Sequence, residues 1–156
     1  MSTNDIKKLV DEKEAKFIDY RFTNTLGKEQ HVTVTASDDG IATDCEEGKM
    51  FDGSSIAGWK DINESDMILM PDTSTAFADP FFDEPTINVT CDVIEPEDGS
   101  SYEKDPRGIA KRAEKFLTDS GIADTAYFGP ENEFFVFDDV KYEDKLGSCF
   151  FKVYTT

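Results

Sequence analysis

The spacing of apolar residues in the first third of the chain predicts a short helix followed by a β-hairpin. Ile6, Leu9 and Val10 recur at helical spacing behind Thr3 or Asn4, either of which can cap a helix. Apolar and charged residues then alternate over 15–22, and apolar positions alternate again over 31–35, so the intervening turn predicts a hairpin with one buried face. Residues 36–48 are polar and weakly patterned, and residues 38–40 predict a turn.

Two stronger strand patterns lie in the middle of the chain. Residues 66–71 form a continuous apolar run that predicts a strand buried on both faces. Residues 87–93 alternate strictly, with one apolar face made of Ile87, Val89, Cys91 and Val93. Between them, residues 79–85 predict a loop that carries two large aromatic side chains.

The pattern changes after an acidic, flexible stretch at 95–101, which we take as a domain boundary. A helix follows, because Asp105 can cap it, Pro106 fits its first turn and Gly121 can end it. Its apolar stripe consists of Ile109, Ala113, Phe116 and Leu117. Residues 125–137 predict a further strand.

The last segment, 149–156, is rich in aromatic and β-branched residues and predicts a strand with no turn or polar tail behind it. An unpaired apolar strand is an aggregation hazard, so it needs partners. It either pairs with the strand predicted at 125–137, or the chain has been cut within a domain. The pattern favours the cut.

Charge excludes several classes of partner. Thirty-four acidic residues against 16 basic residues give a net charge of −18 over 156 residues, which repels nucleic acid and anionic membrane surfaces but suits cations. No apolar run is long enough to cross a membrane, and the N-terminus lacks the pattern of a secretory signal. The cysteines, Cys45, Cys91 and Cys149, form no zinc or disulfide pattern and predict reduced thiols in a cytoplasmic protein.

Glu131 and Glu133 are candidates for metal binding. Alternate residues of a strand share a face, and a rise of about 3.3 Å per residue places the two positions roughly 6.6 Å apart. Carboxylates at this spacing suit Mg²⁺ or Mn²⁺. The alternative is a solvated strand face with two acids. Because Phe135 and Phe137 continue that face toward a core, the carboxylates would need a counter-charge there.

The loop at 50–59 is the second candidate site. Gly53 and Gly58 give the backbone freedom on either side of two serines. A short acid beside such hydroxyls, Asp52, can accept hydrogen bonds from an ammonium or amine group. The alternative is an ordinary turn in which Asp52 and Ser55 bond their own backbone. We interpret Trp59 as a hydrophobic anchor and His31 as a polar residue facing out of a strand.

Several long motifs together resemble bacterial type I glutamine synthetase, in the same order and over residues 5–139. They are GKMFDGSSIAGW at 48–59, NESDM at 63–67, MPD at 70–72, the helix at 105–117, and FGPENEFF at 128–135. The resemblance implies an α+β fold, with a β-grasp-like domain over residues 1–100. Residues 101–156 would then be the first helix and strands of an incomplete catalytic half-barrel.

The resemblance also implies an activity, since the family makes glutamine from glutamate, ammonia and ATP through γ-glutamyl phosphate. Its members use two divalent cations, usually Mg²⁺ or Mn²⁺. They are homo-oligomers whose active sites lie between subunits. By position, Glu131 and Glu133 match ligands of the two cations, and Asp52 matches the acid that a neighbouring subunit lends to the ammonium site. Ser55 matches a hydroxyl beside that site, and Trp59 a loop aromatic near the subunit contact.

This chain is much shorter than members of that family. The remaining metal ligands and most of the ATP and glutamate sites have no counterpart in it, so we expect it to be inactive alone. Two other functions stay open. One is a non-catalytic assembly or regulatory module that pairs with full-length subunits, and the other is a free-standing acidic domain that binds divalent cations.

Overall fold

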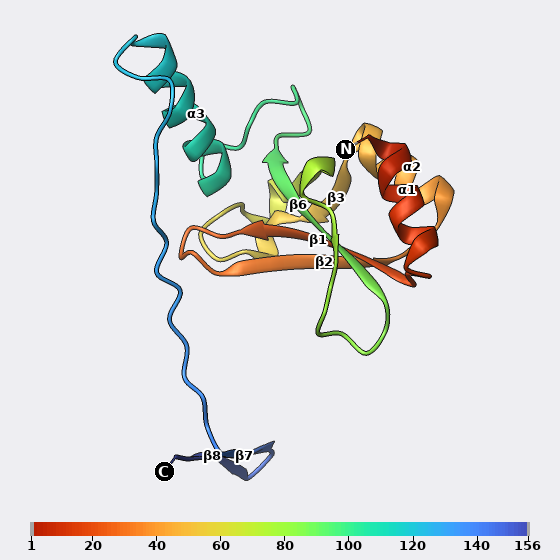
Figure 1. Ribbon diagram of the computed structural model, residues 1–156, viewed down its shortest axis with the longest axis vertical. Coiled ribbons are helices and arrows are strands. Elements are labelled where there is room, and N and C mark those ends of the chain that lie inside the picture. Colours follow the sequence, from red (N-terminus) through yellow and green to blue (C-terminus); the bar gives the residue numbers. More distant parts are fainter. Residues whose placement is uncertain (1, 156) are drawn as a thin grey trace. The chain divides into compact units, whose positions relative to one another are not determined.

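The computed structural model describes residues 2–155, and the chain divides into two compact units, Met1–Thr125 and Ala126–Thr156. The first unit holds a mixed sheet with three helices, and the second holds a β-hairpin (Figure 1). Each unit is described by itself. No helix among residues 2–155 has the length and apolar character that crossing a membrane requires.

The sheet of the first unit has β6 near its centre. Its order is β2 (Glu29–Thr35), β1 (Phe17–Thr23), β6 (Thr86–Ile94), β4 (Asp66–Pro71) and β3 (Lys49–Asp52), with β5 (Phe77–Ala78) also on β6. β1 pairs with β6 in parallel, and every other pair in this sheet is antiparallel. The hairpin predicted from the first alternating segments is therefore confirmed as β1 and β2.

The hydrophobic core forms along the strands with the clearest patterns. On β6, the side chains of Ile87, Val89, Cys91 and Val93 are all at most 1% exposed, as the alternation predicts. On β4, Met67 and Leu69 are fully buried, whereas Ile68 and Met70 are only half-buried. The prediction of a strand at 66–71 is confirmed, but burial is complete on one face only because β4 has a single fully covered side.

β1 differs from its prediction in one respect, because its polar face is buried as well. Asp19 is 1% exposed. It accepts hydrogen bonds from Thr33 Oγ1 at 2.6 Å and Arg21 Nε at 2.9 Å, and His31 Nδ1 lies 2.7 Å from its Oδ1. Arg21 also donates to Asp79 at 2.9 Å. These partners satisfy a charge that alternation alone would place in solvent.

Two helices, α1 (Thr3–Glu12) and α2 (Asp38–Glu47), lie side by side next to the sheet (Figure 1). The helix α1 is capped by Ser2, whose N–H donates to Asp5 Oδ2 at 2.6 Å. The prediction of Thr3 or Asn4 as the cap is wrong, because only Ser2 has an acid three residues later to complete a capping box.

The turn predicted at 38–40 is also wrong, because α2 begins there. Ser37 caps this helix by accepting from the Gly40 N–H at 3.3 Å. The helix buries only Ile41 and Asp44. A helix with so narrow a buried stripe leaves little periodicity in the sequence, so its contacts with the neighbouring helix and sheet determine it.

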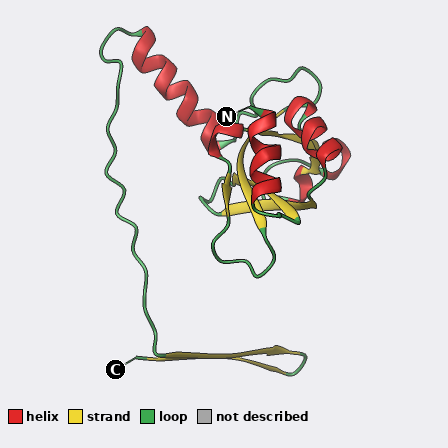
Figure 2. Ribbon diagram, turned by 45° about the vertical axis from the view of Figure 1, so that its right-hand side comes forward, coloured by secondary structure: helices red, strands yellow, loops and turns green. Residues whose placement is uncertain are grey.

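The third helix, α3 (Pro106–Asp119), is capped by Asp105 as predicted. The buried Asp105 carboxylate accepts from the backbone N–H groups of Arg107 and Gly108, both at 3.1 Å, and from that of Val93 at 3.2 Å. It therefore joins the helix to the central strand. In Figure 2 the helix projects away from the sheet, and its apolar stripe is largely exposed, with Phe116 at 72%.

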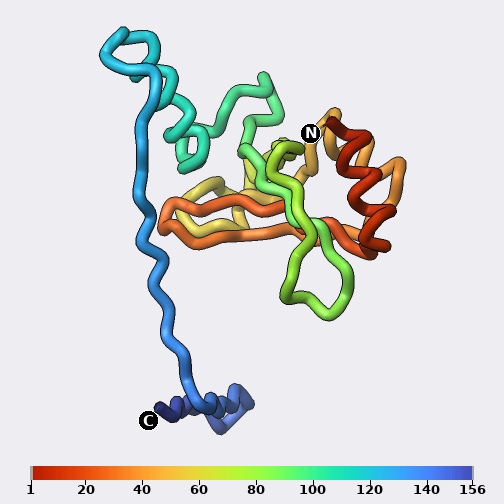
Figure 3. Tube along the Cα trace, viewed as in Figure 1, coloured from red at the N-terminus to blue at the C-terminus, as the bar shows by residue number. Residues whose placement is uncertain are grey.

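The second unit corrects one prediction and excludes one alternative. Residues 125–137 have no regular secondary structure and run as an extended tube in Figure 3, so the predicted strand is absent there. The terminal strand does form, as β8 (Ser148–Tyr154), but it pairs with β7 (Asp139–Lys145) rather than with 125–137. β7 is the nearer partner in the chain, and the tight turn between them at Gly147 has a φ of +90°.

Candidate functional site

The loop that leaves β3 carries Asp52, the first sequence-predicted site residue. Asp52 is exposed, and its Oδ1 accepts from the N–H of Ser54 at 2.9 Å and from its hydroxyl at 2.6 Å. These hydrogen bonds begin the short 3-10 helix η1 (Gly53–Ser55), on which Ser55 is also exposed. The turn predicted as the alternative is thus confirmed for Asp52, and it holds the carboxylate on the surface.

The electrostatics of this turn favour the charged form of Asp52. The hydrogen bonds from the Ser54 hydroxyl and then the Ser54 N–H lower the pKa of the Asp52 carboxyl below its ordinary value of 3.8. The group is therefore an anion at neutral pH. An exposed anion is suited to binding a cation.

Gly53 fixes where this turn starts. Its N–H donates to the carbonyl of Ser65 at 2.7 Å, and a Cβ at this position would lie 2.3 Å from Met67 Sδ. Any larger residue would therefore push the turn away from the buried strand β4. The glycine is needed because of this close approach.

The fold adds a second carboxylate that the sequence reasoning missed. Asp52 and Asp66 are directly opposite each other in the β3–β4 pair. Side chains of directly paired residues share a face of the sheet, so two exposed acids lie together at the end of this ladder. A cation at this end of the ladder would be attracted by both carboxylates. A prediction that 49–52 pairs with 66–71 would have placed Asp66 opposite Asp52.

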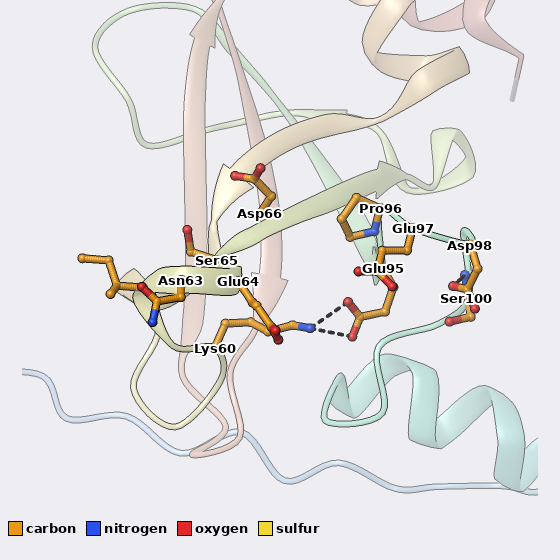
Figure 4. A pocket seen from close by; sticks show the side chains of 11 residues that line it. Lys60, Asn63, Glu64, Ser65, Asp66, Glu95, Pro96, Glu97, Asp98 and Ser100 are labelled. Carbon is orange, nitrogen blue, oxygen red and sulfur yellow. Dashed lines mark hydrogen bonds and ion pairs between the residues drawn. The ribbon is translucent and has the colours of Figure 1, made fainter.

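Asp66 also borders the acidic pocket, a cavity of about 670 Å³ shown in Figure 4. Eleven residues line it: Lys60, Ile62, Asn63, Glu64, Ser65, Asp66, Glu95, Pro96, Glu97, Asp98 and Ser100. Five of them are acids, and Lys60 is the basic residue among them. The pocket is formed by the β3–β4 loop on one side and the segment after β6 on the other.

Lys60 crosses this pocket to Glu95. Its Nζ donates to both carboxylate oxygens, at 2.9 and 2.8 Å, as the dashed lines in Figure 4 show. This hydrogen bonding raises the pKa of Lys60 above its ordinary value of 10.5, so the ammonium stays charged at neutral pH. With Glu95 paired to Lys60, the other acids give the pocket a net negative charge.

Trp59 closes the loop as a buried anchor, which confirms that interpretation. It is 5% exposed, and its ring centroid lies 5.5 Å from that of Phe22, 6.3 Å from that of Phe51 and 5.2 Å from that of Tyr102. Pairs at these distances stabilise a core beyond the area they bury. His31, as predicted, lies on β2 with its side chain largely exposed.

The two candidate metal ligands lie in the second unit, whereas Asp52 and Trp59 lie in the first. Glu131 and Glu133 are exposed on the extended segment, and Phe135, which continues it, is 87% exposed. The apolar face expected to lead them into a core is therefore not covered. Their carboxylates have the chemistry that Mg²⁺ or Mn²⁺ prefers, but no group of three His, Cys, Asp or Glu residues among 2–155 could hold a metal ion. A cation there would need further ligands.

The cysteines are free thiols in different surroundings: Cys91 is buried, Cys45 half-buried and Cys149 exposed. Burial raises the pKa of the Cys91 thiol above its ordinary value, and the same effect acts more weakly on Cys45. A protonated, buried thiol is a poor nucleophile, so Cys91 belongs to the core.

Two family models match the chain, and together they define its class. The first, glutamine synthetase, beta-Grasp domain, matches residues 14–96, and the second, glutamine synthetase, catalytic domain, matches residues 103–155. The chain is thus an α+β protein that begins with a β-grasp domain and continues into part of an enzyme domain. It belongs to the glutamine synthetase family. The boundary that we placed at residue 100 stays a prediction.

Similar proteins agree with this membership. The chain is 60% identical over 153 residues to glutamine synthetase of Methylococcus capsulatus, a match that covers 98% of this chain and 32% of that protein. It is 57% identical to 3-hydroxylaminophenol mutase of Cupriavidus pinatubonensis, over 99% of this chain and 32% of that protein. The cryo-EM structure of Plasmodium falciparum glutamine synthetase shares the fold with a TM-score of 0.69 at 25% identity, covering 99% of this chain and 30% of that one. The chain thus spans about a third of the length of these relatives.

Proposed function

We propose that this chain supplies the N-terminal part of a glutamine synthetase, which joins ammonia to glutamate with ATP through γ-glutamyl phosphate. The observation that carries the proposal is the 60% identity to the Methylococcus capsulatus enzyme over nearly the whole chain. We further propose a cytoplasmic homo-oligomer with active sites between subunits. The 156-residue chain alone would then be inactive, because it lacks most of the catalytic domain.

In this proposal, Asp52 binds the ammonium substrate. Its exposed carboxylate, low pKa and position opposite Asp66 support an electrostatic role. Asp52 would stabilise the ammonium cation and help to remove one of its protons. The ammonia so formed would attack the γ-carbonyl carbon of the acyl phosphate and displace inorganic phosphate. Ser55, exposed on the next turn, would donate or accept a hydrogen bond beside it.

Glu131 and Glu133 would each ligate one divalent cation, Mg²⁺ or Mn²⁺. The supporting feature is their chemistry and spacing, since two carboxylates two residues apart on an extended segment can serve neighbouring ions. Bound cations would offset the charge of the phosphates of ATP. The remaining ligands and the ATP site would come from the part of the enzyme beyond this chain.

A second activity has a specific observation in its favour. A relative named 3-hydroxylaminophenol mutase is 57% identical to this chain, almost as similar as the glutamine synthetase at 60%. Similarity over this part of the protein does not choose between the two activities, so the test must measure both.

The test is a chimera in which residues 1–156 replace the corresponding part of Methylococcus capsulatus glutamine synthetase. We expect the chimera to form glutamine from glutamate, ammonia and ATP with Mg²⁺ or Mn²⁺. Asp52→Asn should lower kcat/KM for ammonium about 100-fold, because one electrostatic contact to the reacting group is lost. Glu131→Gln and Glu133→Gln should each raise the metal concentration needed for half-maximal activity.

The matched control is Asp61→Asn, an exposed acid in the same loop without a side-chain cap hydrogen bond, which should keep normal activity. A folded, assembled chimera that makes no glutamine, or that converts only 3-hydroxylaminophenol, would overturn the proposal. Tight stoichiometric Mn²⁺ binding by the 156-residue chain itself, lost on Glu131→Gln, would favour the free-standing cation-binding domain. Co-purification of an inactive short chain with full-length subunits would favour the assembly module.

A further inference from the structure

The loop that carries Asp52 and Ser55 is tied to the segment between β6 and α3 by two lysines that reach in opposite directions. Lys104, from the segment, donates through Nζ to the carbonyl of Gly58 at 2.9 Å and also to the carbonyl of Trp59 at 3.5 Å. Lys60, from the loop, donates to both oxygens of Glu95 at 2.8 and 2.9 Å. The loop and the segment are thus held together by hydrogen bonds at consecutive loop residues.

The ring of Tyr102 packs against Trp59 and lies close to Lys60. It is 3% exposed, its centroid lies 5.2 Å from the ring of Trp59, and Lys60 Nζ lies 5.4 Å from that centroid. The N–H of Tyr102 donates to the carbonyl of Val93 at 2.9 Å, which attaches the segment to the central strand β6. The loop is therefore held against a rigid part of the sheet.

Trp59 anchors this end of the loop in the core, and the Lys104 contact adds a constraint at the exposed residue before it. Gly58 is exposed, has a φ of +80°, and would meet nothing within 4 Å if it carried a Cβ. Such a residue is free to pivot. Both acceptors of Lys104 are main-chain carbonyls that directly follow the Gly58 α-carbon, so the ammonium fixes the backbone path after this residue.

The Lys104 contact also joins the two regions of the chain that match different family models. The loop lies in the region that matches the β-grasp domain, 14–96, whereas Lys104 lies in the region that matches the catalytic domain, 103–155. We infer that Lys104, assisted by Lys60 and Tyr102, is a positioning residue that holds the Asp52 loop at a fixed distance from the start of the catalytic domain. This inference rests on the proposed function for the role of Asp52, but the contact itself is testable without it.

The chain offers a direct probe, since Trp59 is its single tryptophan and lies next to the Lys104 contact. In Lys104→Met, which removes the ammonium but keeps the length of the side chain, acrylamide should quench Trp59 fluorescence more strongly. Amide hydrogen exchange over residues 56–61 should become about tenfold faster, because the loop opens locally once a charged hydrogen bond is lost. Exchange in β1 and β6 should not change.

The matched control is Lys115→Met, in which the lysine lies on the exposed face of α3 and pairs with Asp119 at 2.7 Å. It should leave Trp59 quenching and loop exchange as in the parent chain. Lys104→Arg should keep both at the parent level, because a guanidinium can still donate to the two carbonyls. Unchanged loop exchange in both Lys104→Met and Lys60→Met would overturn the inference, as would equal acceleration throughout the sheet.

The catalytic consequence is tested in the chimera. Lys104→Met should raise KM for ammonium several-fold while KM for ATP and KM for glutamate stay constant. Lys104→Arg should keep KM for ammonium at the level of the unmodified chimera. A chimera with no activity would refute the proposed function but leave the loop measurements valid. Faster loop exchange with an unchanged KM for ammonium would overturn the positioning role alone.

Discussion

Phe22 and Phe135 are the same residue type in opposite surroundings. Phe22, in the unit Met1–Thr125, is 3% exposed and packs against Trp59 and Phe51 at ring-centroid distances of 5.5 and 5.0 Å. Phe135, in the unit Ala126–Thr156, is 87% exposed, and the ring of Phe137 stacks on it at 6.0 Å. The first ring lies in a multi-stranded sheet with helices, and the second on an extended segment before a two-stranded hairpin.

The difference teaches that apolar composition does not make a core by itself. A two-stranded hairpin is marginal in water, because it has no layer to cover its faces. Burial needs a second layer, and the first unit supplies it with α1, α2 and the aromatic cluster around Trp59. We therefore expect mutations of equal chemistry to have unequal effects in the two units.

The largest expected difference is between truncations of apolar side chains. Leu69→Ala, at a fully buried position of β4, should lower the free energy of unfolding by about 2–5 kcal/mol. Phe135→Ala removes a larger but exposed side chain and should change it by less than about 0.5 kcal/mol. Urea unfolding followed by Trp59 fluorescence measures both. Equal losses would show that residues 126–155 share the core of the first unit.

A smaller effect is expected where a polar group joins two elements. Asp105→Ala removes a buried acceptor of three backbone N–H groups, which links α3 to β6, and should cost about 1–3 kcal/mol. Asp61→Ala is the control, since Asp61 precedes a 3-10 helix without a side-chain cap hydrogen bond. Thermal unfolding by circular dichroism compares them, and a normal midpoint for Asp105→Ala would contradict the assigned link.

The smallest difference should appear in the pH dependence of stability. Burial raises the pKa of Asp19, but hydrogen bonds from Thr33, His31 and Arg21 outweigh it and bring the pKa below 3.8. Because the folded-state pKa is depressed, this stabilisation is present above pH 3.8 and is lost as the pH falls through the lower folded value.

Unfolding midpoints in urea between pH 6 and pH 2 should therefore fall less steeply in Asp19→Asn than in the parent chain. The comparison in the second unit is Glu143, whose pKa is lowered by its contacts with Lys145 and Ser148 although it is on the surface. Glu143→Gln should leave the pH profile unchanged at 0.15 M salt, because exposed ion pairs are screened. A profile that Asp19→Asn does not alter would exclude Asp19 from acid unfolding.

The sequence predicted those parts of the fold whose signal is local. The alternation over 87–93 predicted β6, and Asp105, Pro106 and Gly121 predicted both ends of the last helix. The family resemblance, carried by long motifs, predicted the β-grasp domain. Within the candidate site, the anchoring role of Trp59 followed from its residue type.

Tertiary structure decided what depends on partners distant in the chain. The helix at 38–47 forms because Ile41 packs into the core, although the sequence of the helix has little periodicity. Asp19 is buried because Thr33, His31 and Arg21 surround it, and Asp66 joins Asp52 because the register of two strands places them opposite each other. The segment 125–137 has the residues of a strand, yet no ladder forms there. Local propensity can favour an extended backbone, but hydrogen bonds and burial require a neighbour that only the fold provides.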